Sequence, residues 1–240
     1  MSDPLGLSFD PVAEDYELGR AGWPPEVVEG VEGEVALDLA AGTGKLTRLL
    51  VEHFPHVIAV EPLDGMRAVL ERVVPDAESL AGTAEAIPLA DAAVDAAFVA
   101  EAFHWFDAAA AARELARVIR PGGMLRLVFN VWKGPFRPSL GPEARELLAR
   151  MGPGGGAKVD AGEWKRGFEG LPFTPLVERH VDHENVADRE RAVAHLVSTS
   201  AAGALPEHER RAIANALREA IPEGEYTVEI DTRIYDTRRL

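Results

Sequence analysis

Short apolar runs alternate with amphipathic stretches between residues 35 and 131. This alternation is typical of βαβ units, in which each strand of a parallel sheet is followed by a helix that covers it. The apolar runs predict strands over residues 35–39, 56–61, 78–82, 94–100 and 124–132. The stretches between them predict helices over residues 45–53, 64–74 and 108–119. In an open sheet of this kind, ligands bind at the carboxyl ends of the strands.

The chain after residue 132 is less regular. It predicts helices over residues 142–150, 162–168, 186–200 and 207–220, and strands over 176–184 and 226–235. The glycine-rich run at 152–157 indicates a flexible break. With these last strands we expect an α/β fold with a Rossmann-like, doubly wound seven-stranded sheet, mostly parallel with an antiparallel edge strand.

Composition and charge narrow the classes of function. A chain of 240 residues with 47% hydrophobic residues can bury the core of one α/β domain. Its formal net charge of -15 disfavours electrostatic binding to nucleic acid or anionic lipid. The lack of cysteine excludes disulfides, thiol nucleophiles and thiolate metal sites. Residues 1–10 do not resemble a secretory signal, and no apolar run is long enough to span a bilayer, so we expect a cytoplasmic protein.

The densest chemical signal is the glycine pair Gly42 and Gly44, which allows a tight turn and a close approach of the backbone to a ligand. A phosphate-binding P-loop has the pattern G-x-x-x-x-G-K-S/T, but Leu39 and Leu46 occupy its first-glycine and hydroxyl positions. The dinucleotide fingerprint G-x-G-x-x-G needs a glycine where this chain has Thr47. The spacing therefore disfavours a nucleoside triphosphate and a dinucleotide.

A third class of site carries one acidic residue before the turn and another at the end of the next strand. Asp38 and Glu61 stand at these positions. The carboxylate of Glu61 is suited to accept hydrogen bonds from both hydroxyls of a ribose. The structural alternatives are a turn-capping role for Asp38 and a solvated strand-end carboxylate at Glu61. We expect an adenosine-type cofactor at the turn between Asp38 and Gly44.

Residues 35–131 closely resemble the class I S-adenosylmethionine-dependent methyltransferases. The resemblance rests on Asp38, the glycine turn and Glu61, together with the run Gly82–Leu89 and the turn Arg120–Gly123 before a strand. It implies S-adenosyl-L-methionine as cofactor and S-adenosyl-L-homocysteine as product. The residues that it places at the cofactor are Asp38, Ala40, Gly42, Thr43, Gly44, Glu61, Pro62, Thr83, Ala84, Glu85, Glu101, Ala102, Tyr16 and Arg20.

Two further segments resemble a narrower set of microbial small-molecule methyltransferases. Ala100–Asp107 is similar to their A-x-A-F-H-W-F-D segment, and Tyr16–Pro24 is similar to their Y-x-x-x-R-P-x-Y-P lead-in. The likeness implies that the N-terminal segment covers the cofactor, with Tyr16 and Arg20 near its methionine carboxylate.

The resemblance also divides a single domain of residues 1–240 into three parts. They are a covering segment (1–30), a cofactor-binding core (31–132) and a variable substrate or cap region with the C-terminal strands (133–240). The chain departs from the family at Thr83, where Asp is frequent, and at Ser198–Ala201, where the family has S-R-S-Y. The second departure implies a changed substrate preference.

His104 is the candidate catalytic residue. An imidazole titrates near neutrality and is suited to take a proton from an oxygen or nitrogen nucleophile; alternatively, His104 is a wall residue beside Trp105 and Phe106. Methyl transfer mainly requires that the acceptor be held close and water excluded. We expect a small-molecule acceptor, no metal, and a monomer or homodimer. Two alternatives stay open: a non-catalytic adenosyl-binding protein and a nicotinamide-dependent oxidoreductase.

Overall fold

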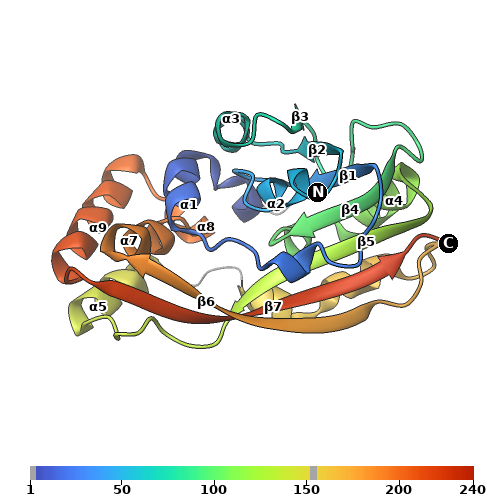
Figure 1. The fold of residues 1–240 in the computed structure, drawn as a ribbon. Coiled ribbons are helices and arrows are strands. Elements are labelled where there is room, and N and C mark those ends of the chain that lie inside the picture. Colours follow the sequence, from blue (N-terminus) through green and yellow to red (C-terminus); the bar gives the residue numbers. More distant parts are fainter. Residues whose placement is uncertain (1–3, 152–155) are drawn as a thin grey trace.

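Within residues 4–151 and 156–240, which the computed structural model describes, seven strands form one sheet (Figure 1). The strands are β1 (Val35–Leu39), β2 (His56–Val60), β3 (Glu78–Leu80), β4 (Val94–Ala100), β5 (Ile119–Trp132), β6 (Val177–Asp188) and β7 (Glu225–Arg238). Their spatial order is β3-β2-β1-β4-β5-β7-β6. Strands β1 to β5 pair in parallel, whereas β7 runs antiparallel to β5 and to β6. The predicted Rossmann-like, mostly parallel α/β sheet is confirmed.

Helices cover both faces of the sheet. The helices are α1 (Ala13–Gly19), α2 (Thr47–Val51), α3 (Asp64–Val73), α4 (Ala108–Val118), α5 (Pro142–Met151), α6 (Gly156–Ala161), α7 (Arg189–Val197), α8 (Ser200–Gly203) and α9 (Glu207–Ala220), with 3-10 turns η1 (Pro4–Leu7), η2 (Asp10–Val12), η3 (Pro25–Val27), η4 (Phe103–Trp105) and η5 (Glu163–Phe168).

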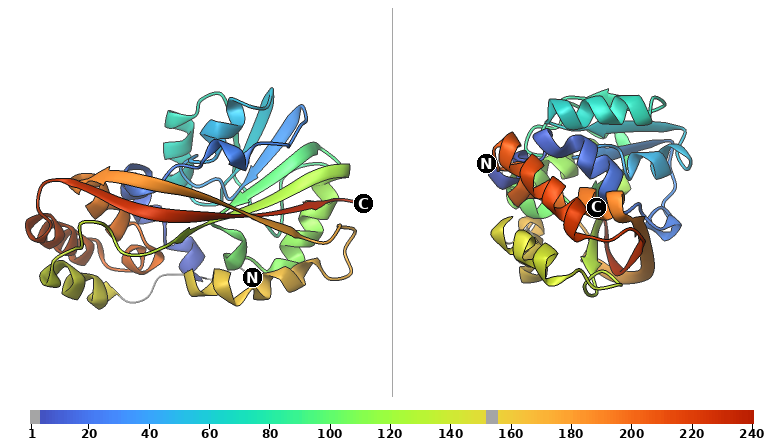
Figure 2. Two further views of the ribbon diagram at one scale, coloured as in Figure 1. Left: turned by 60° about the horizontal axis from the view of Figure 1, so that its bottom comes forward. Right: turned by 90° about the vertical axis from the view of Figure 1, so that its left-hand side faces the viewer.

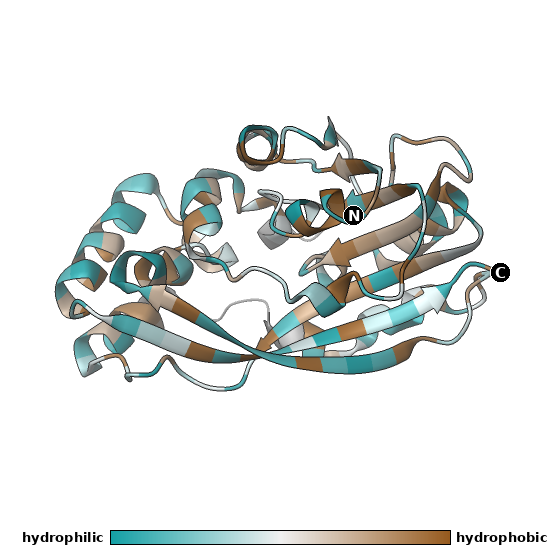
Figure 3. Ribbon diagram, in the orientation of Figure 1, coloured by the Kyte–Doolittle hydropathy of each residue, from teal (hydrophilic) through white to brown (hydrophobic). Residues whose placement is uncertain are grey.

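The central strand β4 shows why the sheet is covered on both sides. Ala97 and Val99 pack in one core with residues of α4 and η5, whereas Ala96 and Phe98 pack in another with Leu50 of α2. These side chains are completely buried. Burial on both faces explains why residues 96–100 of β4 form an uninterrupted apolar run rather than an alternating one, as the hydropathy colouring shows (Figure 3).

The antiparallel end of the sheet continues beyond the parallel strands as a long two-stranded ribbon (Figures 1 and 2). Strand β7 pairs with β5 only from Ile230 to Arg238. Its first residues pair with β6, and Thr227 also forms an isolated bridge with Arg137. Helices α5, α7 and α9 gather at this end of the ribbon around a separate buried cluster that includes Val193, Leu217 and Val228. The variable region therefore builds a second small core beside the main sheet.

Two predicted boundaries in this region are wrong. The strand expected at 176–184 continues to Asp188, because its pairing with β7 continues to that residue. The helix expected at 186–200 is divided into α7 and α8. The Asp188 carboxylate caps α7 by accepting the N–H of Arg191 at 2.8 Å, and the Thr199 hydroxyl caps α8.

The N-terminal segment packs against the variable region where α1 meets α7. A β-carbon at Gly19 would collide with the backbone of His195, so glycine permits this close approach. None of the helices in the described ranges is long and apolar enough to cross a membrane. The predicted flexible break at 152–157 lies largely outside the described residues.

Candidate functional site

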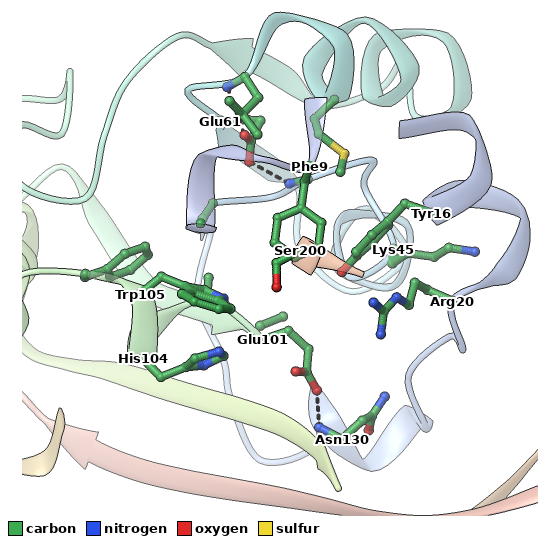
Figure 4. A pocket seen from close by; sticks show the side chains of 18 of the residues that line it. Phe9, Tyr16, Arg20, Lys45, Glu61, Glu101, His104, Trp105, Asn130 and Ser200 are labelled. Carbon is green, nitrogen blue, oxygen red and sulfur yellow. Dashed lines mark hydrogen bonds between the residues drawn. The ribbon is translucent and has the colours of Figure 1, made fainter. Parts of the chain in front are cut away.

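A cavity of about 470 Å³ lies at the carboxyl ends of β1, β2, β4 and β5. The N-terminal segment, with Phe9 and Tyr16, and helix α8, with Ser200, contribute the facing wall (Figure 4). The sequence-predicted residues that line this cavity are Tyr16, Arg20, Ala40, Gly42, Glu61, Pro62, Thr83, Ala84, Glu101, Ala102 and His104. The fold therefore brings most of the predicted site residues together around one cavity.

The turn after β1 has a left-handed backbone at three residues. Ala40, Gly42 and Gly44 have φ angles of 58°, 58° and 86°. A β-carbon at Gly42 would meet no atom within 4 Å, whereas one at Gly44 would lie 2.9 Å from Cγ2 of Val74. Gly42 therefore presents bare backbone to the cavity, and Gly44 allows the turn to pack against the end of α3.

Glu61 directly follows β2 and is 4% exposed. Its Oε2 accepts the N–H of Gly42 and its Oε1 accepts the N–H of Leu63, both at 2.9 Å. Burial raises the pKa of Glu61 to about 7, although both hydrogen bonds oppose this shift. Since each carboxylate oxygen has a second lone pair, Glu61 can anchor the turn and still accept hydroxyl groups of a ribose.

Asp38 lies beneath the turn and is completely buried, outside the cavity lining. Its Oδ2 accepts the hydroxyl of Thr47 at 2.7 Å, and its Oδ1 has no hydrogen-bond partner among the described residues. Burial raises the pKa of Asp38 to about 7. Thr43, Gly44 and Glu85 also lie outside the lining. A direct cofactor contact stays a prediction for these four residues, as it does for those that line the cavity.

Glu101 follows β4 with a left-handed backbone, at a φ of 54°. Its N–H donates to the carbonyl of Val128 at 2.9 Å, and its Oε1 accepts the backbone N–H of Asn130 (Figure 4). Burial raises the pKa of Glu101 to about 7. A non-glycine residue in this conformation is strained and persists because its surroundings hold it, a pattern that clusters at functional sites.

Two cations and a phenol line another part of the cavity. Nε of Arg20 donates to Oγ of Ser198 at 3.2 Å, and its guanidinium lies 5.2 Å from the centre of the Tyr16 ring. Nζ of Lys45 lies 3.8 Å from a carboxylate oxygen of Glu17. Burial raises the pKa of Tyr16 to about 12 and lowers the pKa of Lys45. The group is suited to bind a carboxylate.

His104 lies on η4 and lines the cavity opposite this cationic group (Figure 4). The centre of its ring is 4.7 Å from that of Trp105 and 5.8 Å from that of Phe129. The position allows contact with a bound acceptor, and a role as base stays a prediction.

The lining also contains residues that the sequence did not assign to it, among them Phe9, Lys45, Asn130, Trp132 and His195. Lys45 had a signal, because it directly follows Gly44. Asn130 also had one, since it is a polar residue near the end of a predicted parallel strand. His195 had none: it is buried on α7, 3.9 Å from the centre of the Trp132 ring, and burial lowers its pKa well below the usual value.

Comparison with known proteins gives matches to methyltransferases. Residues 37–127 match the methyltransferase domain family. The chain is 50% identical over 129 residues to an uncharacterized methyltransferase of Mycobacterium tuberculosis, covering 52% of this chain and 53% of that protein. It is 31% identical over 166 residues to a demethylmenaquinone methyltransferase of Paenarthrobacter aurescens, covering 67% and 65%. The chain thus spans about half the length of the first of these relatives.

A solved structure is similar over nearly the whole chain. A methyltransferase from Anaeromyxobacter dehalogenans, described as type II, superposes with a TM-score of 0.61 at 28% identity and covers 91% of this chain and 97% of its own. Together these matches confirm the predicted resemblance to the class I S-adenosylmethionine-dependent methyltransferases.

Proposed function

Because residues 37–127 belong to the methyltransferase domain family, we propose that the protein is an S-adenosylmethionine-dependent methyltransferase that acts on a small-molecule acceptor. The observation that carries the proposal is the pairing of Gly42 with Glu61. Bare backbone and a buried carboxylate meet at one cavity, joined by a 2.9 Å hydrogen bond.

The residues present fit the cofactor. Glu61 would accept its ribose hydroxyls, and Thr83 and Ala84 would lie beside the adenine. Arg20 and Lys45 would bind its carboxylate. Buried Asp38 would hold the turn, or its unpartnered Oδ1 would accept a hydrogen bond from the cofactor after a small shift. When bound, the cofactor supplies an electrophilic methyl group on a sulfonium.

The shape and charge of the site favour a small acceptor. The cavity lies between the strand ends and the covering wall that Phe9 and Ser200 contribute to, so a macromolecular acceptor would have to displace that wall. The net charge of -15 opposes a nucleic acid. The relative in Paenarthrobacter aurescens is named for demethylmenaquinone, a small molecule. The protein's task is then to orient the acceptor and exclude water.

Calorimetric titration with S-adenosylmethionine and S-adenosylhomocysteine tests the proposal. We expect micromolar binding to the wild type. Glu61→Ala should weaken it about a hundredfold, because two hydrogen bonds to a charged group are lost. Glu71→Ala, at an exposed carboxylate of α3, is the matched control and should bind normally. Failure of the wild type to bind either compound would refute the proposal.

A further inference from the structure

The carboxylate of Glu101 is held in place by the fold. Its N–H is bonded to β5, its Oε1 accepts the N–H of Asn130, and the Asn130 side chain in turn accepts the hydroxyl of Thr232 at 2.6 Å. Within the described ranges, no hydrogen bond reaches the other carboxylate oxygen, Oε2, and no lysine or arginine forms an ion pair with the side chain. This fixed carboxylate therefore retains the capacity to accept a proton or a hydrogen bond in the cavity.

The order of the strands places Glu101 near the reactive end of the cofactor. Thr83 and Ala84 follow β3, Glu61 follows β2, the glycine turn follows β1 and Glu101 follows β4. A cofactor held with its adenine near Thr83 and its ribose at Glu61 would extend its 5′ substituent toward β1 and β4. That substituent is the sulfonium that carries the methyl group.

The cavity wall next to Glu101 is mainly aromatic. Arg20 is near enough for its charge to oppose the rise in the pKa of Glu101, but it forms no ion pair with this carboxylate in the described ranges. His104 and Trp105 lie on one side of the carboxylate (Figure 4), and Trp132 lines the cavity from β5. Arg20 and Lys45 belong to the part assigned to the cofactor's own carboxylate. An anionic acceptor placed against Glu101 would meet like charge in a partly buried site, whereas a neutral hydroxyl or amine on a flat apolar body would find an acceptor for its proton.

From this arrangement, and given the proposed function, we infer that Glu101 is a catalytic residue that faces the transferred methyl group and selects a neutral protic acceptor. A lone pair of the acceptor oxygen or nitrogen forms the bond to the methyl carbon. The carbon–sulfur bond breaks, and its electron pair stays on sulfur. The proton of the acceptor moves to Oε2 of Glu101 and then to solvent. Burial raises the pKa of Glu101 to about 7, which makes its carboxylate a better proton acceptor near neutral pH.

The first test uses the charge of the cofactor and needs no acceptor. S-adenosylmethionine carries a sulfonium charge that S-adenosylhomocysteine lacks. In calorimetric titrations, Glu101→Gln should weaken binding of S-adenosylmethionine about tenfold and leave that of S-adenosylhomocysteine nearly unchanged. Asp160→Asn, at a lining carboxylate that is exposed and paired with Arg233 at 2.8 Å, should change neither. Equal losses for both compounds in Glu101→Gln would overturn the inference.

The second test uses phenol, aniline and benzoate as probes. Saturation-transfer NMR is recorded at about pH 8 with saturating S-adenosylhomocysteine, where phenol and aniline are neutral and benzoate is charged. We expect signals from phenol and aniline but none from benzoate, and a benzoate signal in Glu101→Gln. The inference would be refuted if the wild type bound benzoate as strongly as it binds phenol. The proposed function fails separately, if the wild type does not bind the cofactor.

Discussion

The glycine turn allows stability and binding to be separated with two matched substitutions. Gly42 and Gly44 both have a left-handed backbone, which costs alanine roughly 1–2 kcal/mol. Reduced freedom of the unfolded chain offsets about 0.4–1 kcal/mol of that cost. At Gly42 the new β-carbon points into open space, so Gly42→Ala should lower the free energy of unfolding by only about 1 kcal/mol. Ala40 already tolerates the same conformation in this turn.

At Gly44 the same substitution adds a clash. The β-carbon would lie 2.9 Å from Cγ2 of Val74 and 3.3 Å from Cγ of Leu70. Such overpacking typically costs a further 1–3 kcal/mol or so, which makes Gly44→Ala about 2–4 kcal/mol less stable than the wild type. Urea denaturation measures these losses for both variants.

Binding should show the opposite order. Because the methyl group of Gly42→Ala enters the space assigned to the cofactor, calorimetry should show an affinity for S-adenosylhomocysteine at least about tenfold weaker. The folded fraction of Gly44→Ala should bind with a smaller loss. Wild-type affinity in Gly42→Ala would refute the reasoning, because it would show that no ligand approaches the turn at this residue.

Two further predictions concern a buried ion pair and pH. Arg126 is 3% exposed, binds the Asp236 carboxylate through two nitrogens at 2.6 and 2.9 Å, and donates to the carbonyl of Val27. Arg126→Met should therefore lower the free energy of unfolding, measured by urea denaturation, by about 3–5 kcal/mol. A loss below about 1 kcal/mol would contradict this account. Ribose hydroxyls favour ionised Glu61, whose pKa in the free protein is about 7. Cofactor binding below that pH should therefore release protons, and the affinity for the cofactor should rise as the pH approaches 7 and stay level above it. An affinity that does not change between about pH 5.5 and 8 would contradict this prediction.

Local patterns in the sequence were sufficient for the core of the fold and for part of the site. The apolar run at 94–100 identifies β4 because both of its faces are buried, and its carboxyl end places Glu101 at the cavity. Gly42 and Glu61 could be assigned because they stand directly after predicted strands, and parallel strand ends share one edge of a sheet.

The remaining site depends on contacts between distant parts of the chain. Arg20 was placed at the cofactor by the family resemblance, but the contact that holds it is with Ser198, 178 residues away. His195 reaches the cavity only because α7 packs against Gly19 of α1. No periodicity within either segment specifies such a pairing. The start of α7 at Arg189 was missed for a related reason, since the extension of β6 to Asp188 depends on its pairing with β7.

The most direct test of the central claim is the fate of the methyl group. The protein is incubated with methyl-labelled S-adenosylmethionine and, separately, with the low-molecular-mass and macromolecular fractions of a bacterial extract, with Glu61→Ala as the control. The account predicts label in a compound of the low-molecular-mass fraction with the wild type and not with the variant. Label only in macromolecules, or no transfer by a protein that binds the cofactor, would contradict it.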